Sequence, residues 1–311
     1  MTLIINSRNS ITTLKNTANL EGIITASYGK RFGVELSDKS NISCVTRGKK
    51  TDLACGDHVN IKRTAKSEGV IESFAPRKTL LYRSNAFRTK LLAANVTQII
   101  IVLATQPSFY IELLNRCLVA AEAADINALI VLNKCDLKDD IGAFETLKSY
   151  EQLGYPILAM SAAENIEPLK PYLQNEISVL VGQSGMGKST IVNALLPNER
   201  VKTREVSEVL DSGKHTTTAT HLYHLNDNSH LIDSPGLQEF GLNHLTIEQV
   251  EQAFIEFRPF LGHCRFNNCR HLSEPDCAIL NAVTSQKISQ QRMTSFQNLS
   301  NELWAMRNLH Y

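Results

Sequence analysis

Hydrophobic and polar residues alternate in the first quarter of the chain in a way that predicts short β-strands. From Gly22 to about Phe74 the sequence contains the runs GIITASYG, RFGVELS, NISCVTRG, HVNIKRT and GVIESF, separated by turn residues. Alternation with a period of two is typical of strands that bury one face. Five short strands in about 55 residues predict a small barrel of the OB type, with an SH3-like barrel as the alternative.

Residues 76–92 form a basic segment that we interpret as a linker, and a different pattern begins after it. The strands predicted from VTQIIIVLAT, ALIVLNKCD, YPILAMSA and ISVLVG are apolar without alternation, as expected of parallel strands covered on both faces. Helical stretches separate them, which predicts an α/β domain with a mostly parallel sheet and helices on both faces. Residues 246–257 and 278–308 have helical patterns.

These patterns predict four parts: a flexible tail at 1–20, the barrel at 21–78, the α/β domain at 79–241 and a helical domain at 242–311. The longest apolar stretch is far shorter than the roughly 20 residues that cross a bilayer. The N-terminus lacks the apolar core of a secretory signal. We therefore expect a cytoplasmic protein with no membrane partner.

Positive charge is concentrated at the beginning of the chain. The net charge of the whole is +1, but residues 1–90 contain 16 Lys and Arg against 7 Asp and Glu. A basic region on a nearly neutral chain favours a polyanionic partner such as nucleic acid. The alternative is a solvated basic face without a partner.

Residues 182–189 read GQSGMGKS and match the phosphate-loop pattern G-x-x-x-x-G-K-[ST] between a predicted strand and helix. Glycines let backbone N–H groups surround a phosphate, and the helix N-terminus adds a favourable dipole. Lys188 should reach the β- and γ-phosphates and is a candidate catalytic residue, while Ser189 should bind Mg²⁺. The alternative is a chance glycine-rich turn. The nucleotide-binding residues predicted here are Gly182, Gln183, Ser184, Gly185, Met186, Gly187, Lys188, Ser189 and Thr190.

Two further patterns point to a guanine base. Residues 133–136 read NKCD, in which Asp136 would accept hydrogen bonds from guanine N1–H and the 2-amino group. Adenine offers no such donors, so the site would discriminate against ATP. Asn133 would brace the site and the Lys134 stem would cover the base. Ser161 and Ala162, one β-α unit later, would bring a backbone N–H to guanine O6.

The run DSPG at 233–236 fits the D-x-x-G motif of GTPases. Asp233 would hold Mg²⁺ through water, and the Gly236 N–H would contact the γ-phosphate. The preceding GKHTTT run occupies the place of switch I, where Thr216 and Thr217 are both candidates to complete the Mg²⁺ shell.

The order of these motifs is unusual. A typical GTPase chain runs from the phosphate loop through switch I and D-x-x-G to the base motif, whereas here the base motif comes first. The cyclic order is preserved, so the pattern predicts a circularly permuted GTPase domain. Permutation is tolerated because the termini of compact domains often lie close together. It also places switch II directly before the C-terminal domain, to which nucleotide state could be transmitted.

Switch II lacks the glutamine that orients the attacking water in Ras-like proteins, because Leu237 follows the D-x-x-G motif. We therefore predict slow intrinsic hydrolysis that depends on an activator. His215 is a candidate catalytic replacement, since an imidazole can orient water or accept its proton. The alternative is a surface histidine in a loop.

Three cysteines and one histidine cluster near the C-terminus in the pattern C-x4-C-x-H-x5-C. Four such ligands suit a closed tetrahedral zinc site, which predicts one structural Zn²⁺. Unpaired core thiols beside a surface histidine are the alternative. The predicted ligands are Cys264, Cys269, His271 and Cys277.

In combination, these motifs resemble the family of ribosome small subunit-dependent GTPase A. The resemblance rests on YGKRFGV, GDHV, NKCD, GQSGMGKST, GKHTTT, DSPGL and the cysteine pattern, and covers nearly the whole chain. It implies an N-terminal OB-fold, a permuted GTPase domain and a C-terminal zinc domain. It further implies a monomer that binds GTP and GDP, the 30S subunit and its 16S rRNA, acts in late maturation of that subunit, and is stimulated by it.

Two other functions were weighed against this one. A nucleotide-dependent metabolic enzyme such as a kinase would need an acceptor site, which the sequence does not suggest, and NKCD opposes it. A scaffold that does not hydrolyse nucleotide is opposed by the presence of Lys188, Ser189 and Asp233.

Overall fold

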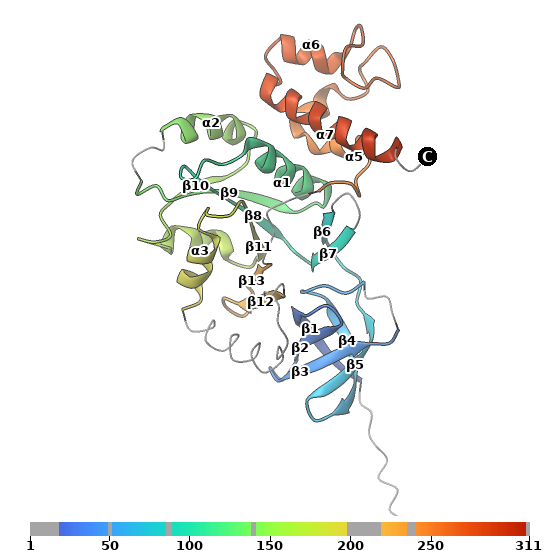
Figure 1. The fold of residues 1–311 in the computed structure, drawn as a ribbon, viewed down its shortest axis with the longest axis vertical. Helices are drawn as coiled ribbons and strands as arrows, with labels where there is room; N and C mark the ends of the chain where they lie inside the picture. The colour runs from blue at the N-terminus through green and yellow to red at the C-terminus, as the bar shows by residue number, and fades with distance from the viewer. Residues whose placement is uncertain are drawn as a thin grey trace, which may run out of the picture.

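The computed structural model describes residues 19–48, 52–84, 89–137, 141–197, 219–234 and 241–308. Figure 1 shows three parts along the long axis: a barrel near the N-terminus, a central sheet with helices, and a group of helices at the C-terminus. The barrel and the C-terminal helices lie at opposite ends of the molecule. Among the described residues, every helix is too short or too polar to cross a lipid bilayer.

The first five strands form the predicted barrel. They are β1 (Asn19–Ser27), β2 (Arg31–Leu36), β3 (Asn41–Thr46), β4 (His58–Ala65) and β5 (Glu68–Phe74). Their order is β1-β2-β3-β5-β4, and antiparallel pairing of β1 with β4 closes the sheet. Alternate residues such as Phe32, Val34 and Ile61 fill the interior. This arrangement confirms the OB-type prediction over the SH3-like alternative.

A buried ion pair fastens the end of the barrel to the segment that follows it. Asp57 is fully buried; its carboxylate accepts the Ala54 N–H at 2.9 Å and two N–H groups of Arg77 at 2.7 and 2.8 Å. A charge buried in this way must be paired, because an unpaired carboxylate loses its hydration without compensation. Arg77 therefore neutralises the buried Asp57 carboxylate and is not an ordinary linker residue.

The predicted linker at 76–92 is wrong in part, because most of it forms a hairpin. Strands β6 (Leu80–Ser84) and β7 (Thr89–Ala94) pair in antiparallel fashion. Leu81 and Leu92 are buried in the same core as the central sheet. The basic residues of this segment obscured its alternation of apolar and polar positions in the sequence. It forms paired strands because Leu81 and Leu92 are buried in the core.

The central sheet has the predicted α/β architecture. Its strands are β8 (Gln98–Ala104), β9 (Asn127–Asn133), β10 (Ile157–Ala159), β11 (Ile177–Val181), β12 (Thr220–His224) and β13 (His230–Asp233). The order is β10-β9-β8-β11-β13-β12, parallel except for β12. The helices around it are α1 (Ile111–Ala123), α2 (Ile141–Gln152), the 3-10 helix η1 (Glu167–Leu173) and α3 (Lys188–Leu195).

Strand β8 explains why the apolar runs lack alternation. All seven of its residues are buried. Ile99 and Ile101 pack with α1 and α2 on one face, whereas Ile100 and Val102 pack with α3 and η1 on the other. Each isoleucine removed from water in this way contributes about 1.5–3 kcal/mol. A strand covered on both faces must be apolar at every position.

The barrel and the central sheet are joined by main-chain hydrogen bonds. Strand β1 pairs with β12, with Ala26 opposite His221 and Ser27 opposite Thr220. A side-chain contact supports the pairing, as His224 Nε2 lies 3.1 Å from Glu35 Oε2. Since β12 begins directly after the predicted switch I, the barrel is attached to the strand between the two switch segments.

The C-terminal part is helical, as predicted, but its helices are shorter than the pattern indicated. They are α5 (Ile247–Ala253), the 3-10 helix η2 (Ile255–Phe260), α6 (Ala278–Thr284) and α7 (Gln290–Asn308). A capping box between Thr246 and Gln249 starts α5. Phe254, Phe257 and Phe296 pack against one another in the core that also contains α1.

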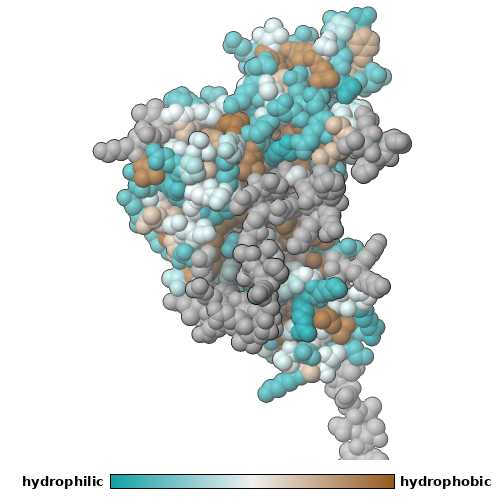
Figure 2. All heavy atoms as spheres, viewed as in Figure 1, coloured by the Kyte–Doolittle hydropathy of each residue, from teal (hydrophilic) through white to brown (hydrophobic). Residues whose placement is uncertain are grey.

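Large apolar side chains at the surface are few. Figure 2 shows brown groups interrupted by teal and white ones on the face in view. The exposed large apolar residues among those described are Val45, Phe74, Tyr110, Phe144, Tyr172, Phe266 and Leu272. They come from all three parts of the chain, and scattered residues of this kind are normal for a folded protein.

We predict that Arg77→Met lowers the free energy of unfolding by about 3 kcal/mol, because it leaves the buried Asp57 carboxylate without its partner. Arg47→Met is the matched control. Arg47 is 73% exposed and lies 3.5 Å from Glu72, so its loss should change stability by less than about 0.5 kcal/mol. Urea unfolding followed by circular dichroism measures both, and equal shifts in the two variants would contradict the assigned role of Arg77.

Candidate nucleotide site and metal centre

The predicted nucleotide motifs meet at one edge of the central sheet. NKCD begins at the end of β9, Ser161 follows β10, the phosphate loop follows β11 and Asp233 ends β13. These four strands are parallel, so their carboxyl ends share one edge. That edge is the usual ligand-binding side of a doubly wound sheet. Motifs that are far apart in the sequence are thereby brought together.

Asn133 connects three of the motifs directly. Its Nδ2 donates to the Met186 carbonyl at 2.9 Å, and its Oδ1 accepts the Ala162 N–H at 2.9 Å. The side chain is almost fully buried, with 2% exposed. Both hydrogen bonds are therefore shielded from water, and losing either would leave a buried polar group unpaired. The base motif thus braces both the phosphate loop and the Ser-Ala loop.

The phosphate loop depends on glycine at specific points. Gly187 has φ +93°, and a Cβ there would lie 2.2 Å from Asn133 Nδ2. Gly182 has φ +145°, and a Cβ there would lie 2.3 Å from the Val102 carbonyl oxygen. Both the backbone conformation and the close approach exclude a larger residue. The loop then leads into α3, which begins at Lys188.

Lys188 folds over the loop that precedes it. Its Nζ donates to the carbonyl oxygens of Gly182 and Gln183, each at 2.6 Å. Burial lowers the pKa of Lys188, and the nearby carboxylate of Asp233 opposes that shift. Asp233 is therefore close enough to act electrostatically on the phosphate-loop lysine.

Several of the groups that would touch a ligand are open to solvent, whereas Gly182, Met186 and Ala162 are buried. Asp136, Ser184, Gly185, Ser189 and Thr190 are exposed. The Lys134 stem is half-buried, and among the described residues the buried Ser161 Oγ has no hydrogen-bond partner. His215, Thr216, Thr217, Gly236 and Leu237 lie outside the described residues.

One part of the site was missed by the sequence analysis. The segment between β8 and α1 packs along the phosphate loop: Lys134 Nζ donates to the Gln106 carbonyl at 2.8 Å, and the Tyr110 N–H donates to Gln183 Oε1 at 2.7 Å. A Cβ on Gly185 would lie 3.3 Å from the Pro107 ring. No motif marks this segment, although its position after a buried strand of the same sheet was an available signal.

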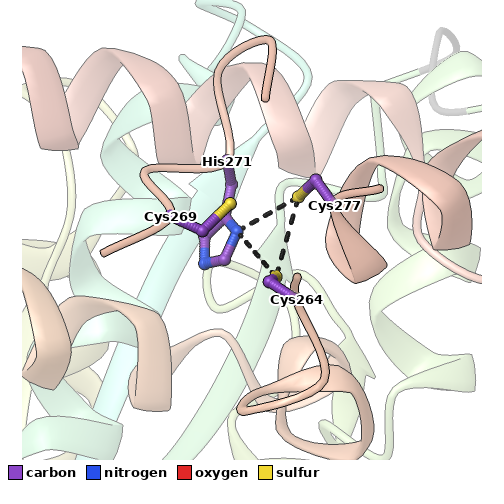
Figure 3. Close-up of side chains that lie close together, drawn as sticks. All are labelled: Cys264, Cys269, His271 and Cys277. Carbon is purple, nitrogen blue, oxygen red and sulfur yellow. Dashed lines mark hydrogen bonds between the residues drawn. The ribbon is translucent and has the colours of Figure 1, made fainter. Parts of the chain in front are cut away.

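The cysteine pattern also forms a cluster. The four predicted ligand atoms of Cys264, Cys269, His271 and Cys277 all lie within 4.8 Å of one another, and Figure 3 shows them pointing toward a common centre. Cys264 Sγ lies 3.6 Å from His271 Nδ1 and 3.9 Å from Cys277 Sγ. Tetrahedral coordination at usual zinc distances places sulfur–nitrogen and sulfur–sulfur pairs about 3.6 and 3.8 Å apart. The cluster can therefore hold a metal ion.

The surroundings of the cluster orient its ligands. His271 is 4% exposed, and its Nε2 lies 3.6 Å from Glu251 Oε1 on α5. A carboxylate on the second ring nitrogen is the usual partner of a metal-binding histidine. Gln297 on α7 donates to the His271 carbonyl at 3.3 Å, and Cys277 is the N-cap of α6. The cluster thus ties α5, α6 and α7 together, and the sequence analysis had not identified Glu251.

Comparison with known proteins identifies close relatives. The family model described as RsgA GTPase matches residues 74–243. The small ribosomal subunit biogenesis GTPase RsgA of Nitrosospira multiformis is 52% identical over 281 residues, covering 90% of each chain. The protein of that name from Neisseria meningitidis serogroup C is 50% identical over 289 residues, covering 93% of this chain and 94% of its own.

Solved structures agree with the fold. YjeQ from Thermotoga maritima is similar with a TM-score of 0.71 and 29% identity, covering 92% of this chain and 99% of its own. YloQ, described as a circularly permuted GTPase, has a TM-score of 0.68 and 26% identity, covering 94% and 97%. These likenesses confirm the permuted arrangement that the motif order predicted.

We predict that Gly187→Ala lowers guanine-nucleotide affinity by at least about 100-fold, since the new Cβ is strained and displaces Asn133 from the phosphate loop. Gly142→Ala in α2 is the matched control, because nothing lies within 4 Å of a Cβ there and alanine favours helix. Titration with a fluorescent GDP analogue measures both. Affinity within threefold of the unmodified protein for Gly187→Ala would refute the assigned role of the loop.

Proposed function

Because the chain belongs to the RsgA GTPase family, we propose that it binds the small ribosomal subunit and hydrolyses GTP during late maturation of that subunit. GTPase activity is a property of this family, and the relatives are named for biogenesis of the small subunit. The observation that carries the proposal is that Asn133 donates one buried hydrogen bond to the phosphate loop and accepts another from the Ser161–Ala162 loop, which joins these loops into one site.

Each motif has a role in this proposal. Asp136 accepts hydrogen bonds from guanine, and one backbone N–H of the Ser161–Ala162 loop reaches guanine O6. The phosphate-loop amides and Lys188 hold the β- and γ-phosphates, because positive and N–H groups placed there stabilise the charge that develops during transfer. Ser189 and, through water, Asp233 hold Mg²⁺.

Switch residues complete the site in the same scheme. Gly236 contacts the γ-phosphate, and either Thr216 or Thr217 binds Mg²⁺. His215 orients or deprotonates the attacking water, since Leu237 has no polar group with which to do so. The absence of a glutamine after D-x-x-G supports slow hydrolysis by the isolated protein.

The metal in the C-terminal cluster is proposed to be one Zn²⁺. Three thiols and one imidazole are a donor set that zinc prefers, and the spacing of their atoms suits a tetrahedron. All four positions are supplied by the protein, so the ion is structural. It would hold together the segment between η2 and α6, in which all four ligands lie.

Contact with 16S rRNA is proposed for the barrel. Lys30, Arg31, Arg63 and Lys66 are exposed on it, and cationic side chains on an OB barrel suit a phosphate backbone. Affinity for the subunit should therefore fall as salt concentration rises. We propose a monomer that works in the cytoplasm, where the small subunit matures, and that alternates between GTP and GDP.

The deciding measurement is turnover of GTP and ATP with and without purified 30S subunits. We expect GTP hydrolysis to increase at least about tenfold with subunits and ATP to be a poor substrate, because Asp136 lacks donors to pair with in adenine. Preference for ATP would support a metabolic enzyme instead. Indifference of GTP turnover to the subunits would refute the proposed function.

The same assay decides the role of His215. We expect His215→Ala to abolish stimulated turnover while GTP still binds, because only the attacking water loses its partner. Unchanged stimulated turnover in this variant would eliminate the histidine as the catalytic group without affecting the rest of the proposal.

Metal analysis tests the zinc site. We expect one zinc per chain, lost in Cys269→Ser together with a lower melting temperature, since a structural zinc contributes directly to folding. Cys44→Ala is the control, because Cys44 is buried in the barrel and should leave the zinc content at one. A different metal, or zinc retained in Cys269→Ser, would contradict the assignment.

A further inference from the structure

The side chain of Gln183, in the phosphate loop, contacts the beginning of α1. Gln183 occupies a variable position of the motif, and its Oε1 accepts the backbone N–H of Tyr110 at 2.7 Å. Tyr110 is the N-cap residue of α1, and its side chain makes no capping hydrogen bond. The first N–H groups of a helix lack partners within the helix. Gln183 therefore supplies a hydrogen-bond acceptor for one of these N–H groups from the phosphate loop.

Further contacts hold the beginning of α1 against the loop. The Gln106 carbonyl accepts Lys134 Nζ at 2.8 Å, and the Pro107 ring lies close to Gly185. Residues 105–110 are thus packed along the site on one side and lead into α1 on the other. A displacement of the phosphate loop must be accommodated by α1 or by breakage of the Gln183 hydrogen bond.

The first half of α1 is bound equally directly to α7. Glu112 accepts the Ser295 hydroxyl at 2.7 Å and Asn298 Nδ2 at 3.0 Å. Buried Asn115 donates to Ser295 Oγ at 2.6 Å. Tyr110 and Asn115 are only about 7–8 Å apart along the helix axis. Hydrogen bonds within little more than one turn of α1 therefore reach both the phosphate loop and the C-terminal helices.

More distant contacts reinforce the union of α1 with α7. Arg116 forms an ion pair with Glu302, and Arg292 Nη1 donates to Asn115 Oδ1 at 2.7 Å. Arg292 is 2% exposed and is paired in turn with Glu256. Such a buried, mutually satisfied network resists gradual deformation, so α1 and α7 should move as one body.

We propose that Gln183 is a positioning residue that couples the phosphate loop to the C-terminal helices through α1, so that a displacement of those helices by the bound small subunit reaches the site of GTP hydrolysis. The inference rests on the proposed function for the identity of the partner. A misplacement of reacting groups by about 1 Å costs as much as 100-fold in rate, so a single anchoring hydrogen bond is sufficient to affect turnover. By linkage, nucleotide binding must in turn affect α7.

The kinetic test compares Gln183→Met, which has similar size but lacks the acceptor, with Gln183→Glu, which retains it. At saturating GTP we expect Gln183→Met to lower subunit-stimulated kcat about tenfold with KM changed less than about threefold, and Gln183→Glu to retain stimulated kcat within about threefold. Stimulated kcat within about threefold of the unmodified protein in Gln183→Met, or a loss in Gln183→Glu as large as that in Gln183→Met, would overturn the proposal.

A second variant, on α7, acts at the other end of the proposed connection. Ser295→Ala should lower stimulated turnover about fivefold while basal turnover is retained, and combining it with Gln183→Met should add little, because both changes interrupt the same connection. Thr294→Ala is the control, since Thr294 is exposed and its hydroxyl donates to the Gln290 carbonyl of its own helix. Rate losses that multiply in the double variant would overturn the proposal.

Hydrogen exchange tests the coupling without ribosomal subunits. On binding a non-hydrolysable GTP analogue, the amides of residues 290–300 should change protection in the unmodified protein and not in Gln183→Met. An unresponsive α7 in the unmodified protein, or the same response in both, would overturn the coupling. Failure of the proposed function would be recognised separately, by turnover of the unmodified protein that ignores the subunits.

Discussion

The parallel pairing of β8 with β11 is the interaction on which the rest of the structure depends. Gln98 to Ile101 lie opposite Ser178 to Val181, and this ladder joins β8–β10 to β11–β13. The base-reading loops belong to the first group and the phosphate loop and Asp233 to the second. Without the ladder, Asn133 would have neither the Met186 carbonyl nor a phosphate loop to brace. The permuted chain order does not disturb the site, because the β8–β11 pairing depends on where the strands lie in space and not on their order in the chain.

Permutation also determines where the two accessory parts are attached. The barrel extends the central sheet through β1 and β12, beside the segment between the switches. The C-terminal helices pack on α1, and the chain reaches them directly after switch II. The barrel is therefore attached to the strand that follows the predicted switch I in the chain, and the C-terminal helices come after the predicted switch II.

Buried polar groups mark both attachments. Asp57 and Arg77 hold the barrel to the segment before the hairpin, while Asn115, Arg292 and Glu256 join α1 to the C-terminal helices. Apolar packing alone would tolerate sliding, because dispersion contacts have little directional preference. Hydrogen bonds between buried charged groups require one geometry, and a mispaired arrangement leaves a charge uncompensated. These groups therefore specify the relative placement of the parts.

The sequence predicted the OB-type barrel and the parallel sheet, because each leaves a local pattern of apolar positions. It also predicted the phosphate loop, the base motif and the metal cluster, because each needs particular residues at short spacing. The hairpin at 80–94 was not predicted, because its basic residues masked two leucines that are buried only in the assembled core. The contacts of Gln106, Gln183 and Glu251 could likewise not be predicted from the sequence. Each of them depends on a partner distant in sequence, and only tertiary packing decides which distant groups come within hydrogen-bonding distance.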